Sequence, residues 1–156
     1  MGPYYLTVLI KMLGPIVEVI SYSQKSFDNR KVDNPEVKYN NIDVDVDTHY
    51  IALLKFKSGV VVDFQVSFDI WKPYDPKLEL YGTISSLKFA DPNNYDGEVS
   101  IFNKEAFQWE LVHSPPNKEN NVSKEQLYLP FHVLDVMNTI DLYNQNGKWA
   151  NIKQQF

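Results

Sequence analysis

Between Val62 and Ile70 apolar and polar residues alternate strictly, and no other pattern in the sequence restricts the fold as tightly. Successive side chains of a β-strand point to opposite faces, so this period of two predicts a strand with one buried and one polar face. A second strand is predicted over Thr48–Lys57, and Lys57-Ser58-Gly59 joins the two strands as a hairpin. The apolar side, which we expect to pack on helices, consists of Val60, Val62, Phe64, Val66, Phe68 and Ile70. The polar side consists of Asp63, Gln65, Ser67 and Asp69.

Two helices are predicted to cover that sheet. Tyr4–Leu13 has leucine and isoleucine at helical spacing, and the following Gly14-Pro15 is a helix stop. Ser123, with Gln126 three residues later, forms the spacing of a capping box and predicts the start of a second helix that continues to Gly147. Pro130 either kinks this helix or marks its first turn.

The remaining segments read as short strands joined by polar turns, and Ser26–Asn41 reads as an exposed connection. Together with the hairpin they predict an α+β fold: an open, mostly antiparallel, twisted sheet of about six or seven strands, with helices packed on one face. The short strands are Ile16–Tyr22, Leu78–Tyr81, Leu87–Ala90, Val99–Phe102 and Phe107–Val112.

Length and composition limit the possible functions. A chain of 156 residues with 44% hydrophobic content predicts a single domain over residues 1–156. The absence of cysteine excludes disulfides, thiolate metal sites and cysteine nucleophiles. A net charge of -5 with dispersed Lys and Arg argues against a nucleic-acid partner. No apolar run reaches the roughly 18 to 20 residues of a membrane span, and no signal layout is present, so we expect no membrane partner and a cytoplasmic protein.

The acidic and histidine residues do not match the spacing of a calcium loop or of a two-histidine metal site. Asp43, Asp45 and Asp47 alternate as in a calcium loop, but Thr48 replaces the required glycine and Leu54 the chelating glutamate. We therefore expect a solvated strand edge and no metal site. His49, His113 and His132 show no two-histidine ligand spacing, and we expect each to be a half-buried structural imidazole.

Two enzyme signatures are also missing. Asp63 and Asp69 lie six residues apart on one strand, roughly 20 Å, which is too far for the carboxyl pair of a glycosidase. The sequence has no Gly-x-Gly-x-x-Gly after a strand and no Walker loop, so this chain alone is not expected to bind a dinucleotide in the usual way. The many tyrosines and tryptophans fit either a sugar-like pocket or an oligomer interface.

Five ordered stretches resemble the C-terminal domain of the Gfo/Idh/MocA oxidoreductases, a family that includes glucose-fructose oxidoreductase and inositol dehydrogenase. The resemblance covers most of Met1 to Asn103 and resumes near Leu129. The stretches are Met1-Gly2-Pro3-Tyr4-Tyr5-Leu6-Thr7 leading to Leu13-Gly14-Pro15; Ser67-Phe68-Asp69-Ile70-Trp71; Leu78-Glu79-Leu80-Tyr81-Gly82-Thr83; Ala90-Asp91-Pro92-Asn93; and His132-Val133-Leu134-Asp135-Val136-Met137.

The resemblance implies a fold like the C-terminal domain of dihydrodipicolinate reductase and a role in substrate binding and oligomerisation. The family's Rossmann domain, which holds NAD(P), is absent from this sequence, so the resemblance implies no cofactor bound by the chain alone. The family's helix motif, Asp-x-Gly-x-His-x-x-Asp, places its glycine at Gly2, its histidine at Tyr4 and its second acid at Thr7. Tyr4 and Thr7 are therefore the candidate substrate-binding residues, although a phenol is a poorer base at neutral pH than an imidazole.

The sequence thus supports two interpretations. In the first, the chain is the substrate and oligomerisation domain of an NAD(P)-dependent dehydrogenase that acts on a sugar or cyclic polyol, is inactive alone, and forms a homo-oligomer through its open sheet face. In the second, it is a non-catalytic remnant or fragment that dimerises through that sheet or binds a carbohydrate without chemistry. The missing dinucleotide domain and the tyrosine at the family's histidine position favour the second interpretation.

Overall fold

The computed structural model describes residues 2–31, 36, 41–72, 78–93, 97–112, 125–144 and 146–153, with backbone only for 125–128. These residues form two compact units. Unit 1 comprises Met1–Ile70 and Lys124–Phe156, and unit 2 comprises Trp71–Ser123. The prediction that residues 1–156 act as one domain stays a prediction.

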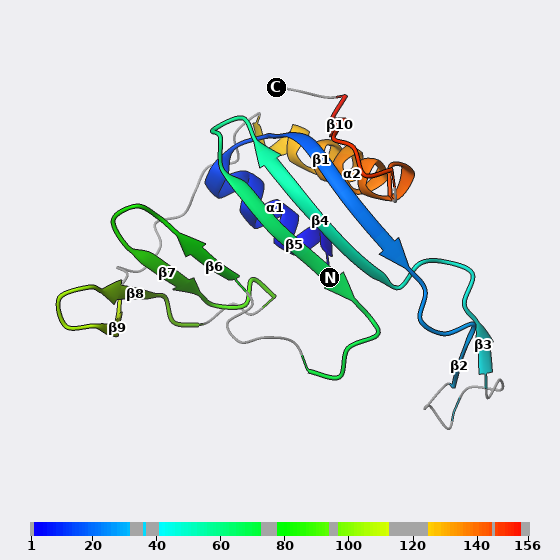
Figure 1. Ribbon diagram of the computed structural model, residues 1–156, viewed down its shortest axis with the longest axis horizontal. Helices are drawn as coiled ribbons and strands as arrows, with labels where there is room; N and C mark the ends of the chain where they lie inside the picture. Colours follow the sequence, from blue (N-terminus) through cyan, green and yellow to red (C-terminus); the bar gives the residue numbers. More distant parts are fainter. Residues whose placement is uncertain are drawn as a thin grey trace. The chain divides into compact units, whose positions relative to one another are not determined.

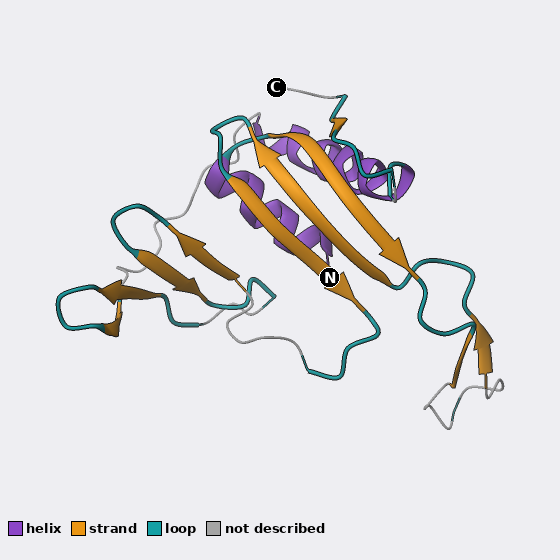
Figure 2. Cartoon of the chain, viewed as in Figure 1, coloured by secondary structure: helices purple, strands orange, loops and turns teal. Residues whose placement is uncertain are grey.

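Unit 1 is a four-stranded sheet with two helices on one face (Figures 1 and 2). Every strand pair in this sheet is antiparallel, and the strand order is β10-β1-β4-β5. The helices are α1 (Gly2–Leu13) and α2 (Glu125–Leu142). The strands are β1 (Ile16–Gln24), β4 (His49–Phe56), β5 (Val61–Ser67) and β10 (Ala150–Asn151).

Local sequence signals set the boundaries of α1 and of the hairpin. α1 ends at Leu13, and Gly14 follows with a φ of +89°, a conformation that suits glycine because it lacks a Cβ. The amide of Gly14 donates to the carbonyl of Ile10 at 2.9 Å and closes the last turn. In the β4–β5 turn, Gly59 has a φ of +88°. The predicted first helix and the predicted hairpin are both confirmed.

The core of unit 1 lies between the helices and the covered face of the sheet. Leu6 and Leu9 of α1 and Val136 of α2 are buried there, as is every second residue of β4 from Ala52 to Phe56. Burial of such side chains supplies most of the stabilisation of a helix-backed sheet. Two polar contacts fix α2 to β1. The amide of Ile16 donates to Nε2 of His132 at 3.0 Å, and the hydroxyl of Ser21 donates to the carbonyl of Ile140 at 2.8 Å.

The uncovered face of this sheet is less polar than the alternation in residues 60–70 predicted. Asp63 and Gln65 of β5 do lie on it, as expected. Their neighbours on β4, Leu53 and Ile51, are apolar and are 41% and 39% exposed. Tyr22 of β1 lies opposite Ile51 and is also exposed. The uncovered face therefore mixes apolar and charged side chains.

The end of the predicted second hairpin strand was wrong. β5 ends at Ser67, so the strand does not continue to Ile70 although the alternation in the sequence does. Phe68, predicted to be buried, is 69% exposed, and Ile70 is exposed as well. Asp69, predicted to point outward with the polar set, has a side chain that is only 7% exposed.

A pair of short strands, β2 (Asn29–Lys31) and β3 (Asn41–Asp43), extends unit 1 beyond the ends of β1 and β4 (Figure 1). We call residues 25–31 and 41–48 the arm. The segment Ser26–Asn41, predicted as an exposed connection, thus contains β2 and the first residue of its antiparallel partner β3. Val44 anchors the arm because its side chain is buried and its amide donates to the carbonyl of Asp28 at 2.8 Å.

Unit 2 is a second antiparallel sheet of four strands in the order β6-β7-β8-β9. On its aromatic face, formed by three rings, Phe102 meets Phe107 and Trp109 edge-on at centroid distances of 5.3 and 5.4 Å. Among the described residues of unit 2, none is buried. The strands are β6 (Leu78–Tyr81), β7 (Ser86–Phe89), β8 (Ser100–Asn103) and β9 (Gln108–Leu111).

The α+β class and the antiparallel pairing are confirmed, but the strands are divided differently from the prediction. One sheet of six or seven strands was expected, whereas the described strands form two sheets of four and one of two. Pro130 lies inside α2, not in its first turn. The predicted capping residue Ser123 lies outside the described residues. No helix in the described part of the chain combines the length and apolar character needed to cross a bilayer.

Candidate functional site

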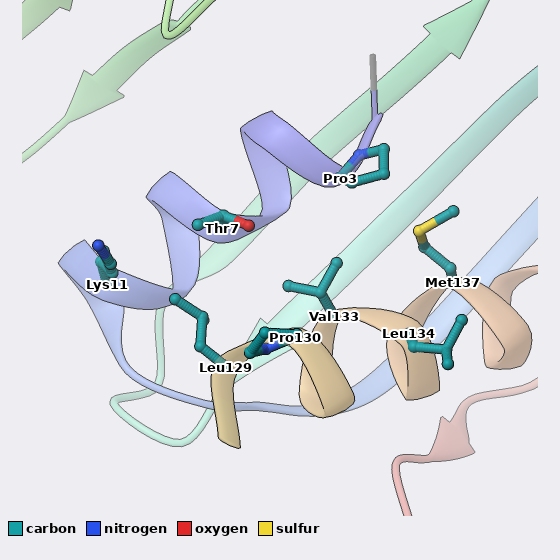
Figure 3. A pocket seen from close by; sticks show the side chains of 8 residues that line it. All are labelled: Pro3, Thr7, Lys11, Leu129, Pro130, Val133, Leu134 and Met137. Atoms are coloured by element: carbon teal, nitrogen blue, oxygen red, sulfur yellow. The ribbon is translucent and has the colours of Figure 1, made fainter. Parts of the chain in front are cut away.

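A groove of about 540 Å³ separates α1 from α2 (Figure 3). Pro3, Thr7 and Lys11 line its α1 side because residues four apart lie on the same face of a helix. The α2 side is apolar, so the hydroxyl of Thr7 and the ammonium of Lys11 are the polar side-chain groups in the lining. The α2 side consists of Leu129, Pro130, Val133, Leu134 and Met137.

The two residues expected to bind substrate are placed differently from one another. Thr7 lines the groove, and Figure 3 shows it on α1 facing the helix-helix gap. Tyr4 is 62% exposed and contributes to neither of the two pockets that we describe in unit 1. The structure therefore does not bring Tyr4 and Thr7 into one pocket, and their role in substrate binding stays a prediction.

A larger pocket, of about 680 Å³, lies at the start of α1 between the sheet and α2. Its lining is richer in hydrogen-bonding groups than that of the groove, and those groups come from three parts of unit 1. Asp45 and Asp47 come from the arm, Tyr50 from β4, and Asn138 and Asp141 from α2. The apolar lining consists of Gly2, Pro3, Leu6, Val46, Phe64, Val66, Phe68, Leu134, Met137 and Ile140.

The polar groups of this larger pocket are held by hydrogen bonds. The phenol of Tyr50 donates to Oδ1 of Asp141 at 3.2 Å. Burial and the nearby carboxylates of Asp141 and Asp47 raise the pKa of Tyr50 to about 12, so the phenol keeps its proton at neutral pH and acts as a donor. The hydroxyl of Ser23 donates to Oδ2 of Asp47 and fixes that carboxylate. Since Asp141 already takes the phenol proton, the pocket offers a ligand the amide of Asn138, which donates and accepts, and several carboxylate acceptors beside apolar surface.

Sequence reasoning did not predict this pocket, although it singled out part of the lining. Asp45 and Asp47 belong to the acidic alternation that partly resembles a calcium loop. In the described residues, no cluster of three or more His, Asp or Glu side chains is arranged to hold a metal ion. Asn138 and Asp141 carried no signal because their position beside Tyr50 arises only when α2 packs on the sheet.

The histidines divide into three cases. His132 is fully buried, not half-buried, and accepts the amide of Ile16, so its role is structural. His49 is half-buried, as expected. His113 lies outside the described residues.

The described residues do not fit a dinucleotide cofactor. Dinucleotide sites lie at the carboxyl ends of parallel strands, beside a glycine-rich turn that opens a helix. Every strand pair among the described residues is antiparallel. Gly14, which separates α1 from β1, follows a helix instead of opening one. We therefore assign no step of a reaction to a nicotinamide cofactor held by this chain.

Comparison with solved structures shows the same fold in several oxidoreductases. An NAD binding oxidoreductase from Klebsiella pneumoniae matches with a TM-score of 0.72 at 15% identity, covering 99% of this chain and 50% of that chain. The apo form of levoglucosan dehydrogenase matches with a TM-score of 0.67 at 12% identity, covering 99% of this chain and 50% of that chain. An aldose-aldose oxidoreductase from Caulobacter crescentus, complexed with glycerol, matches with a TM-score of 0.60 at 13% identity, covering 96% of this chain and 45% of that chain.

These comparisons also give the share of each solved structure that the chain covers. The chain spans about half the length of the solved structures that it matches. A search of the curated proteins finds no match. The family model described as the GFO/IDH/MocA C-terminal domain matches residues 1–88, more than half of the chain. The chain therefore belongs to the Gfo/Idh/MocA family, as a C-terminal domain.

Proposed function

We propose that this chain is the substrate-binding and oligomerisation domain of an NAD(P)-dependent oxidoreductase that acts on a sugar or cyclic polyol. In this proposal, the chain binds the substrate and another protein domain supplies the cofactor, so the chain alone is inactive. The reaction is a hydride transfer at a carbinol carbon. A cytoplasmic location, expected from the sequence, is part of the same proposal.

The observation that carries the substrate class is the mixed lining of the larger pocket. Polyols are bound by carboxylate and amide groups that pair with hydroxyls, together with apolar or aromatic surface that packs against their C–H groups. The pocket combines Asp45, Asp47, Asn138 and Asp141 with the rings of Phe64 and Phe68. Structural neighbours include a levoglucosan dehydrogenase and an aldose-aldose oxidoreductase, which supports the same class.

Titration with myo-inositol and D-glucose, followed by NMR, tests the pocket. We expect saturable shifts at the resonances of Asn138 and Tyr50, and weaker binding of about tenfold for Asn138→Leu because a hydrogen-bond partner of the ligand is lost. Asn151→Leu, at an exposed position of β10 outside the pocket lining, is the matched control. No saturable shift with either compound would contradict the polyol proposal.

Tyr4 and Thr7 are proposed to contact the substrate from α1, Thr7 within the groove and Tyr4 from the exposed surface of the helix. The exposure of Tyr4 and the position of Thr7 in the groove leave both hydroxyls available to a ligand held against this helix. Tyr4→Phe and Thr7→Ala, made in an assembled two-domain relative of this protein, are expected to lower kcat/KM. Unchanged turnover in both variants would remove the two residues from the proposal.

The uncovered sheet face is proposed as the oligomer interface. It is supported by the adjacent apolar residues Tyr22, Ile51 and Leu53, which lie near the ion pair formed by Lys55 and Glu18. Apolar residues rimmed by charges are typical of self-association surfaces. Light scattering at micromolar concentration is expected to give a mass above the 18.2 kDa of one chain, and Leu53→Lys is expected to shift it to that value. A wild-type mass of one chain would contradict the interface.

A titration with NADH separates this chain from a complete enzyme. We expect no saturable change in nicotinamide fluorescence for the chain alone, and saturable binding for a relative that carries a dinucleotide domain. Saturable binding by this chain would overturn the proposed division of labour. The second interpretation, a non-catalytic fragment, would remain if polyol binding and self-association are found but adding a dinucleotide domain restores no turnover.

A further inference from the structure

One wall of the larger pocket is not part of the helix-backed core. Asp45, Val46 and Asp47 of the arm form it together with Phe68, which follows the last residue of β5. Val46 and Phe68 are mostly exposed, so burial of their own side chains contributes little to their position. Something else must hold this wall in place.

Asp69 lies directly behind the wall and receives hydrogen bonds from three parts of the arm. Oδ2 accepts the hydroxyl of Thr48 at 2.6 Å and that of Ser26 at 2.7 Å. Oδ1 accepts Nη2 of Arg30 in an ion pair. A carboxylate with three donors and little exposure is strongly fixed because charged hydrogen bonds are the stronger ones in proteins.

The backbone reinforces the same junction. Nη1 of Arg30 donates to the carbonyl of Phe68 at 3.1 Å, and the amide of Phe68 donates to the carbonyl of Thr48 at 2.9 Å. The Nε atom of Arg30 is buried and has no hydrogen-bond partner among the described residues, so its guanidinium is partly withdrawn from water. Withdrawal from water strengthens the pairing of Arg30 with Asp69 and makes its loss more costly.

Two of the contacting residues, Thr48 and Asp69, are direct sequence neighbours of residues in the wall. Thr48 is the residue after Asp47, and Asp69 is the residue after Phe68. The hydrogen bond between Thr48 and Asp69 therefore ties the two strips of the wall to each other. If it breaks, the wall loses this tie, and the hydrogen bonds of Ser26, of Arg30 and of the Phe68 amide are left to connect the segment of Phe68 and Asp69 to the arm.

We propose that Asp69 is a positioning residue for the larger pocket, which holds the wall of Asp45, Asp47 and Phe68 in the shape that binds a polyol without contacting the ligand. Arg30 and Thr48 are its partners. The ligand class rests on the proposed function above, whereas the positioning of the wall does not. Asp69 itself is absent from the pocket lining, which distinguishes its role from that of Asp45 and Asp47.

Hydrogen exchange of backbone amides tests the positioning without a ligand. In Asp69→Asn, the amides of Val44, Thr48 and Phe68 are expected to exchange about tenfold faster or more, because each is hydrogen-bonded within the arm or to it. The amides of Val19 and Leu54 in the sheet are expected to keep their wild-type rates. Equal acceleration at all five positions would show a global loss of stability and would overturn the proposal, as would unchanged rates at all five.

Thr48 supplies a second, milder variant with its own rescue. Thr48→Val removes the hydroxyl at nearly constant shape and is expected to accelerate the same three amides, whereas Thr48→Ser keeps the hydroxyl and is expected to behave as wild type. Glu18→Gln, which breaks the ion pair with Lys55 elsewhere on the sheet, is the matched control and should leave the arm unchanged. Acceleration by Thr48→Ser equal to that by Thr48→Val would overturn the role of the hydroxyl.

Binding of myo-inositol completes the experiment. Asp69→Asn is expected to weaken binding by about tenfold relative to wild type, and Glu18→Gln to leave it unchanged. If wild type does not bind myo-inositol or D-glucose, the proposed function fails and the exchange rates alone decide the role of Asp69. If wild type binds and Asp69→Asn binds equally well despite faster exchange in the arm, the positioning role is overturned and the proposed function stands.

Discussion

Unit 1 and unit 2 each contain a four-stranded antiparallel sheet, yet the described residues of the two differ in burial. In unit 1 the helices cover one face, and side chains such as Phe56 and Leu54 are nearly inaccessible. In unit 2 the described strands have neither face fully covered, and contacts between exposed or half-buried rings take the place of a core. The comparison shows that backbone pairing alone does not determine how strongly a sheet is stabilised, because apolar burial supplies most of the free energy.

The largest test of this difference compares two phenylalanines. Phe56→Ala should lower the free energy of unfolding by about 3–5 kcal/mol, since its side chain is 1% exposed and its removal leaves a cavity. Phe102→Ala should lower it by only about 1–2 kcal/mol, the value of two edge-on ring contacts and partial burial. Urea unfolding followed by circular dichroism measures both. Equal losses would mean that unit 2 has a core comparable to that of unit 1.

A smaller effect is expected from the imidazole that joins α2 to β1. His132→Leu removes the acceptor of the Ile16 amide inside the core of unit 1, and an unpaired buried donor costs about 1–3 kcal/mol. His49→Leu, at a half-buried position, is the control and should change stability by less than about 0.5 kcal/mol. The same urea titration measures both variants. If the two losses are equal, burial of His132 does not matter to unit 1.

Asp69 gives unit 1 a pH dependence that the polar contacts of unit 2 are not expected to share. The pKa of Asp69 lies below its usual 3.8, chiefly because of the hydrogen bond from Thr48. The hydrogen bond from Ser26 and the charges of Arg30 and His49 lower it further, whereas burial acts in the opposite direction. The ionised form therefore stabilises the fold above the unfolded pKa, and this contribution is lost as the pH falls through the folded pKa. The stability difference between wild type and Asp69→Asn should be present at neutral pH and vanish once the pH lies below the folded pKa. A constant difference would contradict this assignment.

The smallest expected effect concerns the aromatic face of unit 2. The ammonium of Lys88 lies 4.2 Å from the ring centroid of Trp109 and 3.8 Å from a carboxylate oxygen of Glu79. Lys88→Met should lower stability by about 0.5–1 kcal/mol and alter the emission of Trp109, because an exposed cation–π contact contributes little. Lys104→Met in the adjacent turn is the control. A loss as large as that of Phe56→Ala would show that charge contacts, not burial, maintain unit 2.

Much of unit 1 could be predicted because its signals are local. The helix over residues 4–13, its stop at Gly14 and the hairpin around Gly59 each follow from a few neighbouring residues, and the structure confirms them. The division of the strands into separate sheets could not be predicted, because the same alternating pattern is compatible with any pairing partner. The sequence alone does not decide whether Pro130 lies within the helix or in its first turn, because a proline is tolerated within a helix when tertiary contacts compensate.

The candidate site was predictable only in part. The family motif identified Thr7, which lines a groove, and Tyr4, which does not. Asp69 was assigned to the polar side of a strand because the alternation continues through it, whereas β5 ends two residues earlier. The pairing of Tyr50 with Asp141 joins residues 91 positions apart and depends wholly on how α2 packs. Contacts of this kind appear in no local pattern.

The outer strands of the unit 1 sheet, β10 and β5, differ in how open they leave the sheet to the addition of another strand. The outer edge of β1 is already hydrogen-bonded to β10, which is only two residues long, while no described strand pairs with the outer edge of β5. An incoming extended segment could therefore extend this sheet at β5, whereas on the other side β10 already occupies the edge of β1 at Glu18 and Val19. Because fibre growth by edge-to-edge pairing requires two free edges per molecule, a short strand that occupies part of one edge disfavours such growth of unit 1.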